Sequence, residues 1–124
     1  MASHVSRTLE LFRDRGWLAC VVERYNSFIK VKNDAFGFGD VLACHEGPPP
    51  WIMLAQVCGA DVASHIDKIR IEPRTRTWLQ SGGCIYIYGW TKRGEAGKRK
   101  VWTVREIEVC LDETRSKIEF LEID

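Results

Sequence analysis

The sequence predicts an α/β domain built on a mixed central sheet flanked by helices, and two observations support this fold class. The expected segments follow one another in the order helix, strand, strand, strand, helix, strand, strand. The run WIMLAQVC is almost wholly apolar, as is typical of a strand covered on both faces. A helical segment follows this strand, so the natural packing is a helical crossover between two strands of one sheet.

The first quarter of the chain predicts a helix and a strand. The helix is expected from Ser6, its capping residue, to Arg15, with Gly16 ending it. Residues 17–25, WLACVVERY, are rich in valine and aromatic side chains and predict a strand. Residues 26–35 are polar and mixed, so a loop or an irregular extended segment is expected there.

Two more strands flank a proline-rich turn in the middle of the chain. The run 40–45 is strand-like, and Gly37 and Gly39 before it allow close approach of the backbone. The prolines of EGPPP cannot continue a strand ladder, so they predict a turn. The apolar run 51–58 then forms the next strand.

The second half of the chain predicts helices followed by strands. Asp61 is a candidate N-cap for a helix over 62–71, and Pro73 begins a second helical piece that glycines close. A strand over 84–90 and a long alternating strand over 100–111 follow, separated by a turn rich in glycine and lysine. The last dozen residues are charged and carry no clear pattern.

Length and composition predict a single domain over residues 1–124. A chain of 124 residues with 45% hydrophobic and 28% charged residues has ordinary globular composition, which excludes disorder. No apolar run approaches the roughly 18 residues that span a membrane, and the N-terminus lacks the apolar core of a signal peptide. We therefore expect a cytoplasmic protein without a membrane partner.

The cysteines fit that compartment. They number five and are scattered, so a disulfide framework is not expected. No CxxC occurs, and a zinc site made by Cys44, His45, Cys58 and His65 would match no spacing pattern of zinc ligands. A zinc-based or thiol-based regulator remains a third interpretation of the chain.

Three polar side chains lie on or beside strands that otherwise look buried: Glu23, Asp40 and Gln56. Adjacent strand ends can bring them to one edge of the sheet, and converging oxygen ligands suit Mg²⁺. The alternative is structural. Glu23 would then pair with an arginine, Asp40 would cap a turn, and Gln56 would satisfy a neighbouring backbone group.

The stretch VVERYNSFIKVKNDAFGFGDVLACHEG, followed by WIMLAQVCGADVASHIDKI, resembles the PD-(D/E)XK nuclease superfamily. More narrowly, it resembles small phage and bacterial proteins described as Holliday-junction-resolvase-like. The resemblance covers roughly residues 7–109 and leaves the charged segment 112–124 outside. It implies a restriction-endonuclease-like core in α-β-β-β-α-β order, and a cytoplasm of a bacterium or of a phage-infected host cell.

The resemblance also implies a catalytic site. Glu23 matches the first acid of the superfamily, Asp40 its aspartate, and Gln56 the acid of its last motif, so these three are the expected metal ligands. Gln56 can coordinate Mg²⁺ but brings no charge, and Cys58 stands where a lysine is usual. Some members supply that lysine from the following helix, where Lys68 is the candidate.

Basic residues suggest how a nucleic acid is held. The net charge is only +1, but residues 92–100 carry five basic side chains and one acidic one, whereas 105–124 carry seven acidic and three basic. Cations along a phosphate backbone dominate nucleic-acid affinity. The expected nucleic-acid-binding residues are Lys30, Lys32, Arg70, Arg74, Lys92, Arg93, Lys98, Arg99 and Lys100, with a solvated hairpin as the alternative for the last five.

The leading hypothesis is a Mg²⁺-dependent endonuclease, with Mn²⁺ as a substitute metal, that hydrolyses phosphodiester bonds in branched or structured DNA. Resolvases of this superfamily commonly act as dimers, so a homodimer is expected. The alternative is a non-catalytic nucleic-acid-binding or assembly module that keeps the nuclease fold, which the residues at positions 56 and 58 favour.

Overall fold

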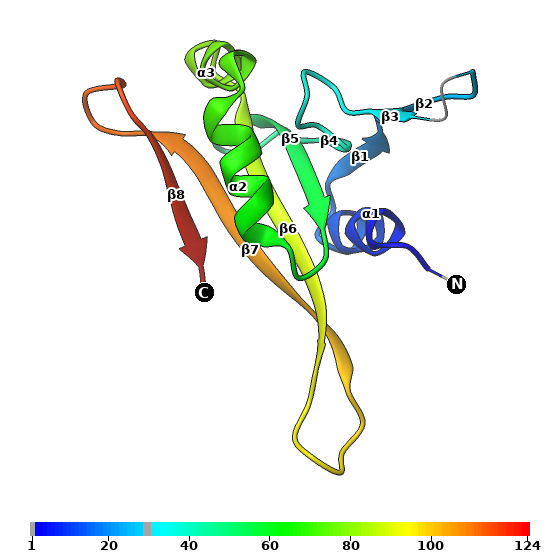
Figure 1. Ribbon diagram of the computed structural model, residues 1–124. Coiled ribbons are helices and arrows are strands. Elements are labelled where there is room, and N and C mark those ends of the chain that lie inside the picture. Colours follow the sequence, from blue (N-terminus) through cyan, green and yellow to red (C-terminus); the bar gives the residue numbers. More distant parts are fainter. Residues whose placement is uncertain (1, 29–30) are drawn as a thin grey trace.

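A six-stranded mixed sheet forms the centre of the computed structural model, which describes residues 2–28 and 31–124 (Figure 1). Its strand order is β1-β4-β5-β6-β7-β8, and β2 and β3 pair separately as a small hairpin. The elements are α1 (His4–Asp14), β1 (Leu18–Val21), β2 (Arg24–Asn26), β3 (Val31–Asn33), β4 (Val41–His45), β5 (Trp51–Cys58), α2 (Val62–Ile71), α3 (Pro73–Gln80), β6 (Cys84–Arg93), β7 (Val101–Leu111) and β8 (Ile118–Ile123).

The connections confirm the predicted mixed sheet. Strands β1, β4 and β5 are antiparallel neighbours, β5 and β6 are parallel, and β6, β7 and β8 are again antiparallel. A parallel pair needs a crossover, and α2 with α3 returns the chain from the end of β5 to the start of β6. The helical crossover after the third strand of the sheet is therefore where the sequence predicts it.

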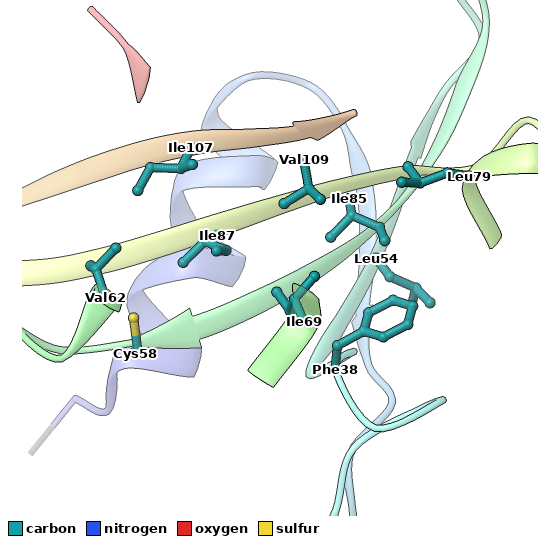
Figure 2. Packing of buried hydrophobic residues seen from close by; sticks show 10 residues of the cluster. All are labelled: Phe38, Leu54, Cys58, Val62, Ile69, Leu79, Ile85, Ile87, Ile107 and Val109. Atoms are coloured by element: carbon teal, nitrogen blue, oxygen red, sulfur yellow. The ribbon is translucent and has the colours of Figure 1, made fainter. Parts of the chain in front are cut away.

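Alternation along β5 places the core on both faces of the sheet. One face of β5 packs in the cluster that contains Phe12 of α1, through Met53, Ala55 and Val57. Leu54 lies on the other face and packs in the cluster under α2 and α3. Figure 2 shows this second cluster, in which side chains from α2, α3 and strands β5, β6 and β7 meet Phe38. Both faces are thus covered, as the apolar run predicts.

Helix α1 begins earlier than expected. Ser3, not Ser6, is its N-cap, and the Ser3 hydroxyl accepts a hydrogen bond of 3.0 Å from the backbone N–H of Ser6. Thr8 then ties the helix to the sheet, because its buried hydroxyl accepts a hydrogen bond of 2.9 Å from the indole N–H of Trp90. Gly16 follows the helix at φ +82°, a conformation that favours glycine.

Two segments differ from their predictions. The predicted strand 17–25 is interrupted at Val22 and Glu23, and its last residues belong to the separate β2–β3 hairpin. Part of the segment 26–35, expected to be irregular, is thus strand. The charged C-terminal segment also contains β8, whose Ile118 and Phe120 pack against the core. Among the described residues, no helix has the length and apolar character needed to cross a membrane.

Candidate active site

Three carboxylates meet at the end of β5, on the face of the sheet that α2 covers. Glu23, Asp34 and Asp40 each offer one oxygen, and these oxygens lie within 4.8 Å of one another. They line an open cavity of about 490 Å³. The cavity is bounded by Ser3, His4, Val5, Val21, Glu23, Asp34, Asp40, Gln56, Val57, His65 and Lys68.

Strand register explains why Asp40 and Gln56 are neighbours. Val41 of β4 pairs with Ala55 of β5, so the next positions, Asp40 and Gln56, face one another on the opposite side of the sheet. The Gln56 side-chain amide donates a hydrogen bond of 2.6 Å to Asp40 Oδ2, and the backbone N–H of Val57 donates another of 2.8 Å. Both Asp40 and Gln56 are buried.

Glu23 reaches the same cavity because β1 ends beside Asp40. The backbone carbonyl of Asp40 accepts hydrogen bonds from the N–H groups of Val22, at 3.0 Å, and Glu23, at 3.4 Å. The interruption between β1 and β2 therefore sets Glu23 next to the start of β4. The structure brings Glu23, Asp40, Gln56 and Lys68, four residues singled out from the sequence, to one cavity.

Asp34 is the cavity carboxylate that sequence reasoning missed. A tight turn brings it to Asp40: Ala35 forms a bridge with Gly39, so the residues that flank this pair, Asp34 and Asp40, emerge side by side. Gly37 lies at the tip of the turn with φ +81°. The signal was the FGFG segment between two aspartates, because a turn centred on Gly37 sets both acids at mirrored positions.

The electrostatics of the pair follow from burial. Burial, a hydrogen bond with Asp34 and the charges of Asp34 and Glu23 raise the pKa of Asp40 to about 8. Burial opposes ionisation of Asp34 as well, but hydrogen bonds with Asp40 and Lys68 outweigh it and lower the pKa of Asp34. Asp40 is thus the member of the pair that favours the protonated form, and Asp34 the member that favours the charged form.

Lys68 lies on α2 at the mouth of the cavity. Its ammonium group is 2.7 Å from Asp34 Oδ2, and 43% of its side chain is exposed. Cys58, which occupies the position where a lysine is usual in the resembled superfamily, is buried in the apolar cluster, and burial raises the pKa of its thiol to about 12. Cys58 is thus neutral, and Lys68 provides the cation.

The donor set of the cavity fits a hard divalent cation. Carboxylate and amide oxygens are the ligands that Mg²⁺ prefers, and Mg²⁺ commonly uses one or two carboxylates together with water. Gln56 Oε1 is buried and has no hydrogen-bond partner among the described residues. A cation at this point would replace the proton that Asp34 and Asp40 share and would satisfy that oxygen.

We expect Gly37→Ala to destabilise the protein and to weaken divalent-metal binding. At φ +81° an L-residue costs about 1–2 kcal/mol, and the added Cβ would lie 2.5 Å from Glu72 Oε1. Thermal melts and Mg²⁺ titrations would measure both effects. Gly82→Ala is the matched control, since Gly82 has φ +95° and nothing within 4 Å of an added Cβ. Equal losses in both variants would contradict a role of the 35–39 turn in positioning Asp34.

The predicted nucleic-acid-binding residues fall into separate regions. Lys92, Arg93, Lys98, Arg99 and Lys100 belong to the β6–β7 hairpin, which projects from the sheet beyond the end of β5 (Figure 1). Arg70 and Arg74 lie on either side of the junction between α2 and α3 and form ion pairs with Asp67 and Glu72. Lys32 lies on β3, and Lys30 lies outside the described residues.

The cavity at the end of β5 combines an acidic ligand set with one lysine at its mouth. Such a set can hold a hard divalent cation and leave that lysine near a bound phosphate. The chemistry of these side chains and the distances between them support this interpretation of the cavity. No protein-family model, no curated protein and no solved structure matches this chain.

Proposed function

We propose that this protein is a divalent-metal-dependent endonuclease that hydrolyses phosphodiester bonds in branched or structured DNA. One observation carries the proposal: oxygens of Glu23, Asp34 and Asp40 lie within 4.8 Å of one another in an open cavity. Carboxylates held this close are costly without a cation or a shared proton, and phosphodiester hydrolysis is a reaction that such a cation assists.

The order of elements supports a restriction-endonuclease-like core. Helix α1, strands β1, β4 and β5, helix α2 and strand β6 follow the α-β-β-β-α-β order of the resembled superfamily. In this proposal the carboxylates stand at the point where β1, β4 and β5 meet at one sheet edge. A homodimer would offer two such cavities to the symmetric strands of a four-way junction.

Each cavity residue has a proposed role. Asp40, Asp34 and Glu23 would hold Mg²⁺ or Mn²⁺ together with the Gln56 side-chain oxygen. When bound, the cation would offset charge on the attacked phosphate and favour an ionised water. Lys68 would contact the attacked phosphate, because its flexible, half-exposed side chain stands at the mouth of the cavity.

The β6–β7 hairpin is the proposed grip on the nucleic-acid backbone. It leaves the sheet at the end where β5 meets the cavity (Figure 1). Near its base, Trp102 is 40% exposed, with the Arg7 guanidinium 3.6 Å from its ring centroid and the Lys92 ammonium 5.2 Å from it. These stacked cations and the basic turn 92–100 would together line a path for phosphates toward the cavity.

We expect the triple substitution Lys98→Gln, Arg99→Gln, Lys100→Gln to weaken DNA binding at all sequences. Each lost phosphate contact lowers the slope of log Kd against log salt by about 0.9, so a change of up to about 2.7 is expected. Fluorescence anisotropy of labelled junction DNA across a salt series would measure it. Lys117→Gln, in the turn at the other end of β7, should leave the slope unchanged. An unchanged slope in the triple variant would remove the hairpin from the interface.

We expect Lys68→Ala to reduce the rate of cleavage by about 100-fold, because a cation near the developing phosphate charge is lost. The fold should persist, since the Lys68–Asp34 pair is partly exposed and contributes about 1 kcal/mol or less. Single-turnover cleavage with saturating metal measures the rate. Arg70→Ala is the control, because Arg70 lies on the same helix but pairs with Asp67. Equal effects of the two substitutions would contradict the proposed role of Lys68.

A specific observation favours the alternative, a non-catalytic nucleic-acid-binding or assembly module. Gln56 donates a hydrogen bond to Asp40, an arrangement that stabilises the carboxyl pair without any cation. Position 58 supplies no lysine. In that case the protein would bind junction DNA through the hairpin, and divalent metal would have no effect on either binding or stability.

The deciding experiment is cleavage of labelled four-way junction, flap and plain duplex DNA in Mg²⁺ and in Mn²⁺, with Asp40→Asn beside the wild type. Cutting by the wild type alone is the expected result, and the ranking of substrates tests the preference for branched DNA. Junction binding without cutting by either protein would overturn the endonuclease proposal in favour of the module.

A further inference from the structure

A second group of metal-ligating side chains lies where β5 joins α2. Cys58, Asp61 and His65 each offer one ligand atom, and these atoms lie within 4.8 Å of one another. His65 Nε2 is 3.1 Å from Asp61 Oδ2. Two ligands about 2.1 Å from one tetrahedral ion are separated by about 3.4 Å, so this pair is already near the spacing of co-ligands.

Asp61 and His65 pair with one another, and the other contacts of these side chains are few. Asp61 occupies the N-cap position of α2, yet its side chain makes no capping hydrogen bond to the helix. His65 Nδ1 is buried and lacks a hydrogen-bond partner among the described residues. The Cys58 side chain lies at the end of β5, at the edge of the apolar cluster beside Val62 (Figure 2), and is only 6% exposed. Helix capping therefore does not account for the position of Asp61, which lies between the buried thiol and the histidine.

We propose that Cys58, Asp61 and His65 form a separate site for a borderline-soft divalent cation such as Zn²⁺. Thiolate and imidazole ligands select zinc-like ions over Mg²⁺, which prefers oxygen alone. Two residues separate Cys58 from Asp61 and three separate Asp61 from His65, spacings that occur between zinc ligands. Asp61 and His65 also share one helix face as an i, i+4 pair.

The exposure of the group fits a three-ligand site with one open coordination position. The side chain of Asp61 is 64% exposed and that of His65 20%, so an ion has a route of entry and a place for a water ligand. His65 also lines the acidic cavity, and Cys58 lies two residues after Gln56. An ion here would fasten the start of α2 to the end of β5, next to the carboxylates but not among them.

The test is a Co²⁺ titration of the reduced, metal-free full chain without nucleic acid. Co²⁺ is the probe because thiolate ligation produces a charge-transfer band and tetrahedral geometry intensifies its visible bands. With excess Mg²⁺ present to occupy the acidic cavity, we expect the thiolate band to reach full intensity at one equivalent of Co²⁺ and Zn²⁺ to remove it. Cys58→Ser and His65→Gln should each weaken binding at least about 100-fold. Cys20→Ser and Cys44→Ser, controls at free cysteines outside the group, should bind as the wild type does.

Three results would overturn the proposal: no thiolate band in the wild type, a band that survives Cys58→Ser, or a band lost in Cys44→Ser. Circular dichroism confirms that each variant is folded. Should the buried Cys58→Ser variant fail to fold, His65→Gln decides, because the histidine is partly exposed. The absorption band does not depend on cleavage, so the test of this metal site is separate from the test of the proposed nuclease activity.

Discussion

Asp40→Asn should make the metal-free protein more stable while abolishing cleavage. The pKa of Asp40 is about 8 in the folded protein, against 3.8 for a free aspartate carboxyl, so the folded state holds this proton where the unfolded chain has lost it. The unfolding free energy therefore falls as pH rises from about 4 to about 8. Asparagine does not ionise and so has no cost of burying a charge. Its side-chain N–H can donate to the Gln56 oxygen once the Gln56 amide has rotated by half a turn.

Each unit by which the pKa is raised contributes about 1.4 kcal/mol, so the gain should be at least about 2 kcal/mol at pH 8, roughly 5–10 °C or more in Tm, and close to zero near pH 4. Thermal melts of both proteins across this pH range, in chelator, would measure it. Saturating Mg²⁺ should raise the Tm of the wild type but not that of Asp40→Asn, because a cation that binds only the folded state stabilises it. Cleavage should fall about 1000-fold or more. A variant that is less stable than the wild type at pH 8 would contradict the strained carboxyl pair.

Gln56→Glu should have the opposite effect on stability and should strengthen metal binding. The substitution removes the 2.6 Å hydrogen bond to Asp40 and sets another carboxyl, at a buried position, against the pair. An uncompensated buried charge costs about 3–5 kcal/mol. A unit charge about 4 Å from a divalent cation contributes several kcal/mol even at an effective dielectric constant of ~20, so Mg²⁺ affinity should rise at least about tenfold.

Denaturant unfolding in chelator and in Mg²⁺ would measure both effects for Gln56→Glu. Gln80→Glu is the matched control, since Gln80 is exposed at the end of α3. The substitution also separates the two candidate functions. Cleavage that appears in Gln56→Glu but is absent from the wild type would identify the wild type as the non-catalytic module. Weaker Mg²⁺ binding by Gln56→Glu than by the wild type would contradict the placement of a cation beside Asp40.

Much of the fold follows from local pattern. The apolar run of β5 allowed only a strand buried on both faces, and the helical spacing after Asp61 allowed only a crossover from it. Hydrophobic periodicity is set by residues close together in the chain, so it predicts secondary structure without knowledge of the tertiary contacts. The edges of elements were less certain: Ser3 and Ser6 can both cap a helix, and which one does so depends on the backbone that precedes α1.

The site residues, too, include some that the sequence predicts and one that it does not. Glu23, Asp40 and Gln56 could be singled out as polar residues on apolar strands, and strand adjacency was enough to expect them at one edge. Asp34 could not, because its position depends on the bridge between Ala35 and Gly39. The separation of β2 and β3 from the main sheet and the addition of β8 to its edge likewise depend on pairing between distant segments.

Local sequence thus specified which residues of this chain are apolar, which are polar and with what period. Tertiary structure decided which carboxyl lies beside Asp40, and it set Asp61 next to Cys58 and His65. The physical reason is that hydrogen bonds, shared protons and metal ligation act over a few ångströms. Strand register and turn geometry set those distances, and both are determined by contacts between segments far apart in the chain.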